Sequence, residues 1–161
     1  SVQLKPRIET LKEKKLIGQS LKMSLTDNQT SFLWGQFAPR IKEIQNRNSV
    51  DKISMQIYPP KYYQAFNPSN EFEKWAAVEV HDFSSIPEGM KSFNLSGGLY
   101  AVFDYKGSSA DPSIFQYVFS EWLPKSNYLI DDRPHFEVLG EKYKNNDPNS
   151  EEEIWIPIKA K

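Results

Sequence analysis

The 161-residue chain has no cysteine and only two histidines, His81 and His135. The absence of cysteine excludes disulfides, thiolate metal sites and cysteine nucleophiles. Each histidine stands alone beside acidic residues, and His81-Asp82 has no further ligand at metal-binding spacing. We therefore expect both histidines to lie at the surface and the chain to bind no metal.

The motifs of common cofactor-dependent and nucleophilic enzymes are also absent. No phosphate-binding loop or dinucleotide fingerprint occurs, and Gly97-Gly98 is too short to be one. No serine stands in a nucleophile elbow. We expect no cofactor and no conventional catalytic constellation.

Neither sign of charge dominates the chain. Twenty basic and twenty-one acidic residues give a net charge of −1, and no helix-turn-helix or basic region is recognisable. Direct binding of nucleic acid is therefore not expected. The sequence also lacks a signal peptide and a membrane-spanning run, so we expect a cytoplasmic location and no membrane association.

The composition is that of a folded protein with many aromatic rings. Hydrophobic residues make up 39% of the chain and aromatic residues 14%. This length fits one domain, residues 1–161, with a substantial core. The high aromatic content indicates a core or a pocket lined by rings.

Residues 96–123 form the clearest supersecondary unit. The run over 99–105 is rich in β-branched and aromatic residues and lies between glycines, which predicts a strand. A helix is predicted next, with Asp111 as N-cap and Pro112 in the first helical position, ending at Pro124. Its apolar face comprises Ile114, Phe115, Val118, Phe119 and Trp122.

The remaining patterns predict further strands and one more helix. Strands are predicted within residues 7–23, where Gly18 indicates a bulge or close packing, and over 52–58, 75–80, 93–95, 136–139 and 154–158. A helix is predicted over 32–44, interrupted by Pro39. The aromatic, proline-rich segment 59–70 either covers a pocket or, as we favour, merely joins two strands. Residues 141–153 are predicted to form a mobile, charged surface loop.

This order places strand, helix, strand, strand twice along the chain. It predicts an α+β fold in which two pseudo-symmetric units, residues 1–82 and 83–161 approximately, form a mostly antiparallel sheet. Two helices would cover one face of that sheet. No sequence repeat between the units is visible.

Several motifs resemble one known family. They are Gly98-Leu99-Tyr100-Ala101-Val102-Phe103, Lys106-Gly107, Trp122-Leu123-Pro124-Lys125-Ser126, Pro134-His135-Phe136-Glu137 and Glu153-Ile154-Trp155-Ile156-Pro157-Ile158. In this order they resemble the gyrase-inhibitor-like (GyrI-like) family, the effector-binding domains of AraC- and MerR-type transcription regulators. The resemblance implies the same α+β fold, with a ligand cleft between the two halves.

Two carboxylates are candidates for that cleft. In its strand, Glu137 faces away from Phe136 and Val138, and the residues alone favour a solvated strand face. The resemblance instead implies that Glu137 lies among aromatic rings and meets cationic, lipophilic ligands. Glu79, on the same strand face as Trp75, would make a cross-strand ion pair or line the pocket. Glu121 and the run Glu151–Glu153 are expected to be solvated.

Aromatic residues are the candidates for the walls of the cleft, although any one of them is more often part of a core. Phe103 and Trp122 are expected to be core. The predicted ligand-binding rings are Trp34, Phe37, Trp75, Tyr100 and Trp155.

Three functions remain open at this point. The first is a stand-alone effector-binding or sequestering domain, of the multidrug-binding kind, for a hydrophobic and cationic small molecule. The second, implied by relatives in the resembled family, is a hydrolase of electrophilic cyclopropane-type compounds with Glu137 as general base. The third is a protein-interaction module like the family's gyrase inhibitor, with a protein partner or a homodimer.

Overall fold

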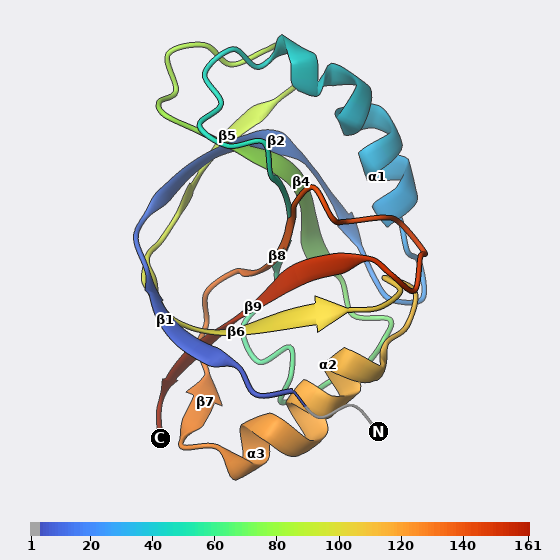
Figure 1. Cartoon of the computed structure of the whole chain (residues 1–161), viewed down its shortest axis with the longest axis vertical. Helices are drawn as coiled ribbons and strands as arrows, with labels where there is room; N and C mark the ends of the chain where they lie inside the picture. The colour runs from blue at the N-terminus through green and yellow to red at the C-terminus, as the bar shows by residue number, and fades with distance from the viewer. Residues whose placement is uncertain (1–3) are drawn as a thin grey trace.

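The computed structural model describes residues 4–161 of the chain (Figure 1). Its strands are β1 (Arg7–Leu11), β2 (Lys14–Met23), β3 (Lys52–Ile57), β4 (Phe72–Val80), β5 (Lys91–Leu95), β6 (Gly98–Lys106), β7 (Tyr128–Ile130), β8 (His135–Leu139) and β9 (Glu151–Ala160). Its helical segments are α1 (Thr30–Phe37), η1 (Ala38–Glu43), α2 (Ser113–Tyr117), η2 (Val118–Trp122) and α3 (Leu123–Lys125). None of these helices is long and apolar enough to cross a membrane.

The strands form one strongly curved antiparallel sheet in the order β1-β6-β9-β8-β3-β4-β2-β5, and β7 pairs with β9. Exchanging β1, β2, β3 and β4 with β5, β6, β8 and β9, respectively, gives the same order read from the other end. The pairing of β3 with β8 therefore lies at the centre of a pseudo-two-fold arrangement. The predicted α+β class with two related units is confirmed.

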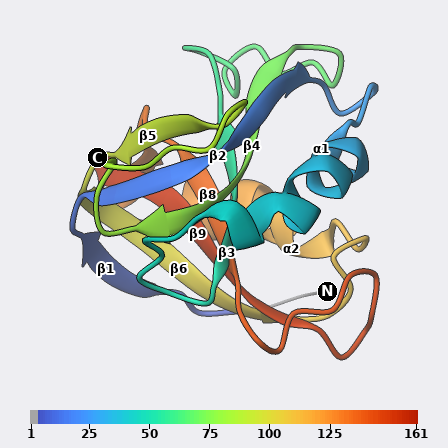
Figure 2. The same ribbon diagram turned by 90° about the horizontal axis from the view of Figure 1, so that it is seen from above.

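Both helical regions pack on the same side of the sheet (Figure 2). α1 covers β2 and β4, where its Leu33 and Phe37 pack on Ala76 and Val78. The segment α2–η2 covers β6 and β9, where Ile114 and Val118 pack on Phe103 and other buried residues. The central strands β3 and β8 lie between these two flanks.

A third core lies on the opposite face of the sheet. Period-two alternation places Trp75 and Ala77 of β4 there, while Ala76 and Val78 point toward α1. Met55 of β3 joins the same core. The predicted division of β4 into two faces is thus confirmed.

The helix after β6 agrees with its prediction at its start and differs at its end. Its first residue is Ser113, after Pro112, and the Ser113 amide donates to Asp111 Oδ1 at 2.9 Å, which is the capping hydrogen bond predicted for Asp111. The helix continues through Pro124 to Lys125. Pro124 cannot donate a backbone hydrogen bond, and the helix widens into the π-helical turn η2 just before it.

Two strand predictions also need correction. β9 begins at Glu151, so the end of the segment predicted to be a surface loop is paired with Lys106 of β6. The short strand β7 was not predicted, because three residues are too few to show an alternating pattern.

Gly18 of β2 pairs with Ala77 of β4, and a β-carbon at this position would collide with the carbonyl oxygen of Ala76. The close packing predicted for Gly18 is therefore confirmed. Gly35 offers the opposite environment, because it lies exposed in α1 with no atom near the position of a β-carbon.

Alanine at these two glycines should have opposite effects on stability. Gly18→Ala is expected to lower the free energy of unfolding by about 1–3 kcal/mol, because the backbones of β2 and β4 must move apart. Gly35→Ala is expected to raise it by about 0.5–1 kcal/mol through helix propensity. Chemical denaturation of both variants checks this, and equal effects would contradict the packing described for Gly18.

Candidate functional site

A narrow cleft opens over the central strands, bordered by α2–η2 on one side and by the β3–β4 connection on the other. The space within it that can hold a water molecule is about 20 Å³. Its lining residues are Gln56, Tyr58, Tyr63, Phe115, Phe119, His135, Phe136, Glu137, Ile154, Trp155 and Ile156. Glu137 is the one carboxylate among these lining residues.

Strand alternation in β8 explains how Glu137 reaches the cleft. Phe136 and Val138 belong to the core on the opposite face, so His135 and Glu137 point toward the helices. In the sheet, Glu137 lies opposite Ser54 of β3 and Ile154 of β9. Its position is therefore set by the pairing that joins the two halves.

The Glu137 carboxylate is half-buried, and its Oε2 accepts a hydrogen bond from Gln56 Nε2 at 3.2 Å. Within residues 4–161, it makes no ion pair with a basic side chain within 4.0 Å. A partly desolvated carboxylate without a directly paired cation is costly, and a positively charged ligand can offset that cost.

Two buried charged groups flank Glu137. Glu152 of β9 is 8% exposed and Lys74 of β4 is 6% exposed. Burial, together with the negative charge and hydrogen bonding of Glu137, raises the pKa of Glu152 to about 9. Burial also lowers the pKa of Lys74, an effect that the charges of Glu137 and Glu152 oppose.

Aromatic side chains close the cleft above these polar groups. The Tyr63 ring stacks on Phe119 with centroids 4.7 Å apart and on His135 at 5.6 Å. Tyr58 meets His135 edge to face at 4.9 Å. Both phenols stay un-ionised, because burial raises the pKa of the Tyr58 and the Tyr63 hydroxyl.

His135 is part of this wall rather than of the surface, so the surface position expected for it is wrong. Its side chain is 5% exposed, and burial together with the charge of Arg133 lowers its pKa to about 3. The imidazole is consequently neutral at physiological pH. It offers a flat ring surface to the cleft and carries no positive charge there.

The structure disperses most of the other residues predicted to bind ligand. Trp34 and Phe37 pack beneath α1, and the backbone of Trp155 borders the cleft while its ring stacks on Phe136 at 5.1 Å. Tyr100 and Trp75 lie with that ring in the opposite core. Ligand binding by these rings stays a prediction.

Glu79 also lies away from the cleft, on the face of β4 that carries Trp75. Its carboxylate pairs with Lys14 Nζ at 3.0 Å and accepts a hydrogen bond from Asn48 Nδ2 at 3.1 Å. This arrangement corresponds to the ion-pair alternative considered for Glu79. A role in ligand binding remains a prediction for this residue.

Several cleft residues were not predicted, although some left a signal in the sequence. His135 stands two positions before Glu137, and Glu152 two before Ile154, so period-two alternation places each pair on one face. The solvated position expected for Glu152 is therefore wrong, whereas Glu151 beside it is exposed. Tyr63 belongs to the aromatic, proline-rich segment 59–70 and lines the cleft, so the alternative that we favoured for this segment, a mere connection between two strands, is wrong.

The chain has clear relatives in sequence. Residues 7–158 match the profile of the family described as Cass2, integron-associated effector binding protein. The transcriptional regulator BrlR of Pseudomonas aeruginosa is 32% identical over 130 residues, which cover 78% of this chain and 45% of BrlR. The chain therefore spans less than half the length of this curated relative.

Solved structures share the same fold. The structure of SAV2435 bound to tetraphenylphosphonium aligns with a TM-score of 0.76 at 15% identity, covering 97% of this chain and 94% of that one. The C-terminal domain of EcmrR aligns with a TM-score of 0.73 at 11% identity, covering 99% and 100%. With its family match over residues 7–158, the chain belongs to the Cass2 family of integron-associated effector binding proteins, within the GyrI-like group that its motifs indicate.

Proposed function

We propose that this effector-binding domain takes a hydrophobic cation in the cleft over β3 and β8, with Glu137 as the charge partner. The observation that carries the proposal is the half-buried Glu137 carboxylate, which lies among aromatic and aliphatic walls and, within residues 4–161, has no basic side chain within 4.0 Å. Tetraphenylphosphonium, the ligand bound to SAV2435, is of this chemical class.

The chemistry of the walls selects the class of ligand. A delocalised cation leaves water at a lower cost than a compact ammonium group, and ring faces attract it by roughly 0.5–2 kcal/mol each. The rings of Tyr58, Tyr63, Phe115 and Phe119 are available for such contacts. An anion would be repelled by Glu137, and a neutral ligand would make no ion pair with its carboxylate.

The cleft must widen for a ligand of this kind to enter. Its space of about 20 Å³ is far below the roughly 300–1,000 Å³ typical of sites for drug-sized molecules. Tyr63 fills the space between Phe119 and His135, and it belongs to the irregular connection between β3 and β4. Ligand entry is therefore proposed to displace the Tyr63 ring.

Removing the charge of Glu137 should weaken cation binding. We expect Glu137→Gln to raise the Kd for tetraphenylphosphonium by about 10–100-fold, because it removes the charge while keeping a side chain of similar size. In the wild type, ligand at one hundred times Kd should stabilise the fold by about 2.7 kcal/mol, a melting shift of roughly 5–10 °C.

Isothermal titration calorimetry and thermal shift check this with two further variants. Glu141→Gln removes an exposed carboxylate near the end of β8 and should leave Kd unchanged. Glu79→Gln tests the other predicted carboxylate. Unchanged binding in Glu137→Gln would overturn the proposal. In a parallel assay, Glu137-dependent hydrolysis of an electrophilic cyclopropane-type compound would identify a hydrolase.

Truncating Tyr63 should speed ligand entry. Stopped-flow measurement with a fluorescent lipophilic cation is expected to give an association rate for Tyr63→Ala at least about tenfold above the wild type, if the open state is normally a minor population. Tyr63→Phe keeps the ring and should leave the rate essentially unchanged. Equal association rates in all three proteins would show that Tyr63 does not limit entry.

A further inference from the structure

Glu137, Glu152 and Lys74 form a cluster of ionisable groups. The carboxyl group of Glu152 has no role in the function proposed above. It extends from β9 toward the helix side of the sheet, one strand over from Glu137 and two residues from Ile154, which pairs with Glu137. Its side chain is more deeply buried than that of Glu137. Among residues 4–161, no basic side chain lies within 4.0 Å of either carboxyl group.

Charge balance in this cluster depends on a proton. With both carboxyl groups ionised and Lys74 protonated, the buried cluster would carry one net negative charge. A proton on Glu152 makes the cluster neutral, and burial and Glu137 raise the pKa of Glu152 to about 9, so the proton is retained at neutral pH. Adding a cation beside Glu137 would then leave the cluster with one excess positive charge.

We propose that Glu152 releases its proton when a hydrophobic cation binds beside Glu137, so that the cleft exchanges one cation for one proton. This inference rests on the proposed function, because it concerns the same site. It makes Glu152 a specificity-determining residue: a neutral ligand of the same shape would gain no charge compensation from it. The net charge of the cluster is the same before and after the exchange.

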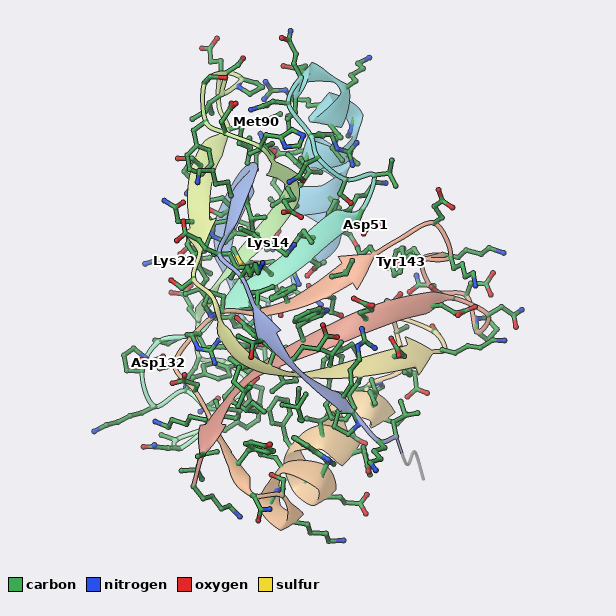
Figure 3. The ribbon with its side chains drawn as sticks, turned by 60° about the vertical axis from the view of Figure 1, so that its left-hand side comes forward. Lys14, Lys22, Asp51, Met90, Asp132 and Tyr143 are labelled. Atoms are coloured by element: carbon green, nitrogen blue, oxygen red, sulfur yellow. The ribbon has the colours of Figure 1, made fainter. Side chains whose placement is uncertain are left out.

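The titratable groups around Glu152 limit the other sources of a proton. Tyr105 of β6 is its partner in the sheet, and Tyr143 lies beyond the end of β8 in the loop that leads to β9 (Figure 3). Burial raises the pKa of both tyrosines, so neither releases a proton near pH 7. His135 is already neutral. Lys74 is the remaining competitor, because a cation would also favour its deprotonation.

Calorimetric titration with tetraphenylphosphonium in two buffers of different ionisation enthalpy counts the protons released. At pH 7.5 we expect the wild type to release between about 0.2 and 0.9 proton per cation, the larger value corresponding to the larger fall in the pKa of Glu152. A cation within about 4–6 Å lowers a carboxyl pKa by about 1–3 units. Between the pKa of Glu152 in the complex and its value of about 9 in the free protein, Kd should decrease by up to tenfold for each unit that the pH rises.

Two neighbouring variants assign the proton. Glu152→Gln mimics the protonated acid and should bind with little proton release and a Kd that is flat with pH. Glu151→Gln removes the adjacent, exposed carboxylate and should behave like the wild type. Proton release that persists in Glu152→Gln would assign the proton to Lys74 and overturn the inference.

The outcomes separate this inference from the function it rests on. Binding without proton release overturns the exchange alone, and the cation site stands. No binding at any pH between 6 and 9 overturns the cation site and the exchange together. If Glu152→Gln fails to fold, the proton count on the wild type still decides whether an exchange occurs.

The ligand-free protein offers an independent measurement. The pKa of Glu152 is raised in the folded state. The folded protein therefore keeps a proton on Glu152 at pH values above about 4.5, where the unfolded chain has lost it. The contribution of Glu152 to stability should therefore decline as pH rises from about 4.5 to about 9. Melting temperatures of Glu152→Gln should decline less over this range than those of Glu151→Gln, and parallel profiles would show that Glu152 is ionised at rest.

Discussion

The antiparallel pairing of β3 with β8 is the interaction on which the rest of this structure depends. It joins the two halves of the sheet, and it brings Ser54 opposite Glu137 and Gln56 opposite His135. Because the helices cover the flanks of the sheet, these central strands are left between them (Figure 2). The cleft is a consequence of that pairing and of two helix-covered cores that do not meet over it.

Desolvation governs the chemistry at this centre. Glu137, Glu152 and Lys74 come from three different strands, and each is wholly or partly removed from water. The cost of burying unbalanced charge is high, and it can be reduced by proton uptake or by a bound counter-ion. A proton on Glu152 balances the charge of the cluster before a ligand binds, and the hydrophobic cation that we propose balances it afterwards.

The aromatic wall is assembled from segments that are distant in the chain. Tyr63 comes from the β3–β4 connection, Phe119 from η2 and His135 from the start of β8. Their stacked rings occupy the space above Glu137 and keep the ligand-free cleft narrow.

The sequence by itself determined the order of elements, because apolar periodicity, turns and caps are local properties. It placed the strand over 99–105, the close approach at Gly18 and the two faces of β4, and its motifs identified the family. Only the tertiary structure decided which rings meet Glu137: Trp75 and Trp155 lie in the opposite core, whereas Tyr63 and Phe119 face the carboxylate. It also decided that Glu152 is buried while Glu151 is exposed. Side-chain alternation predicts faces, but it does not show which face another element covers, since that depends on contacts between residues far apart in the chain.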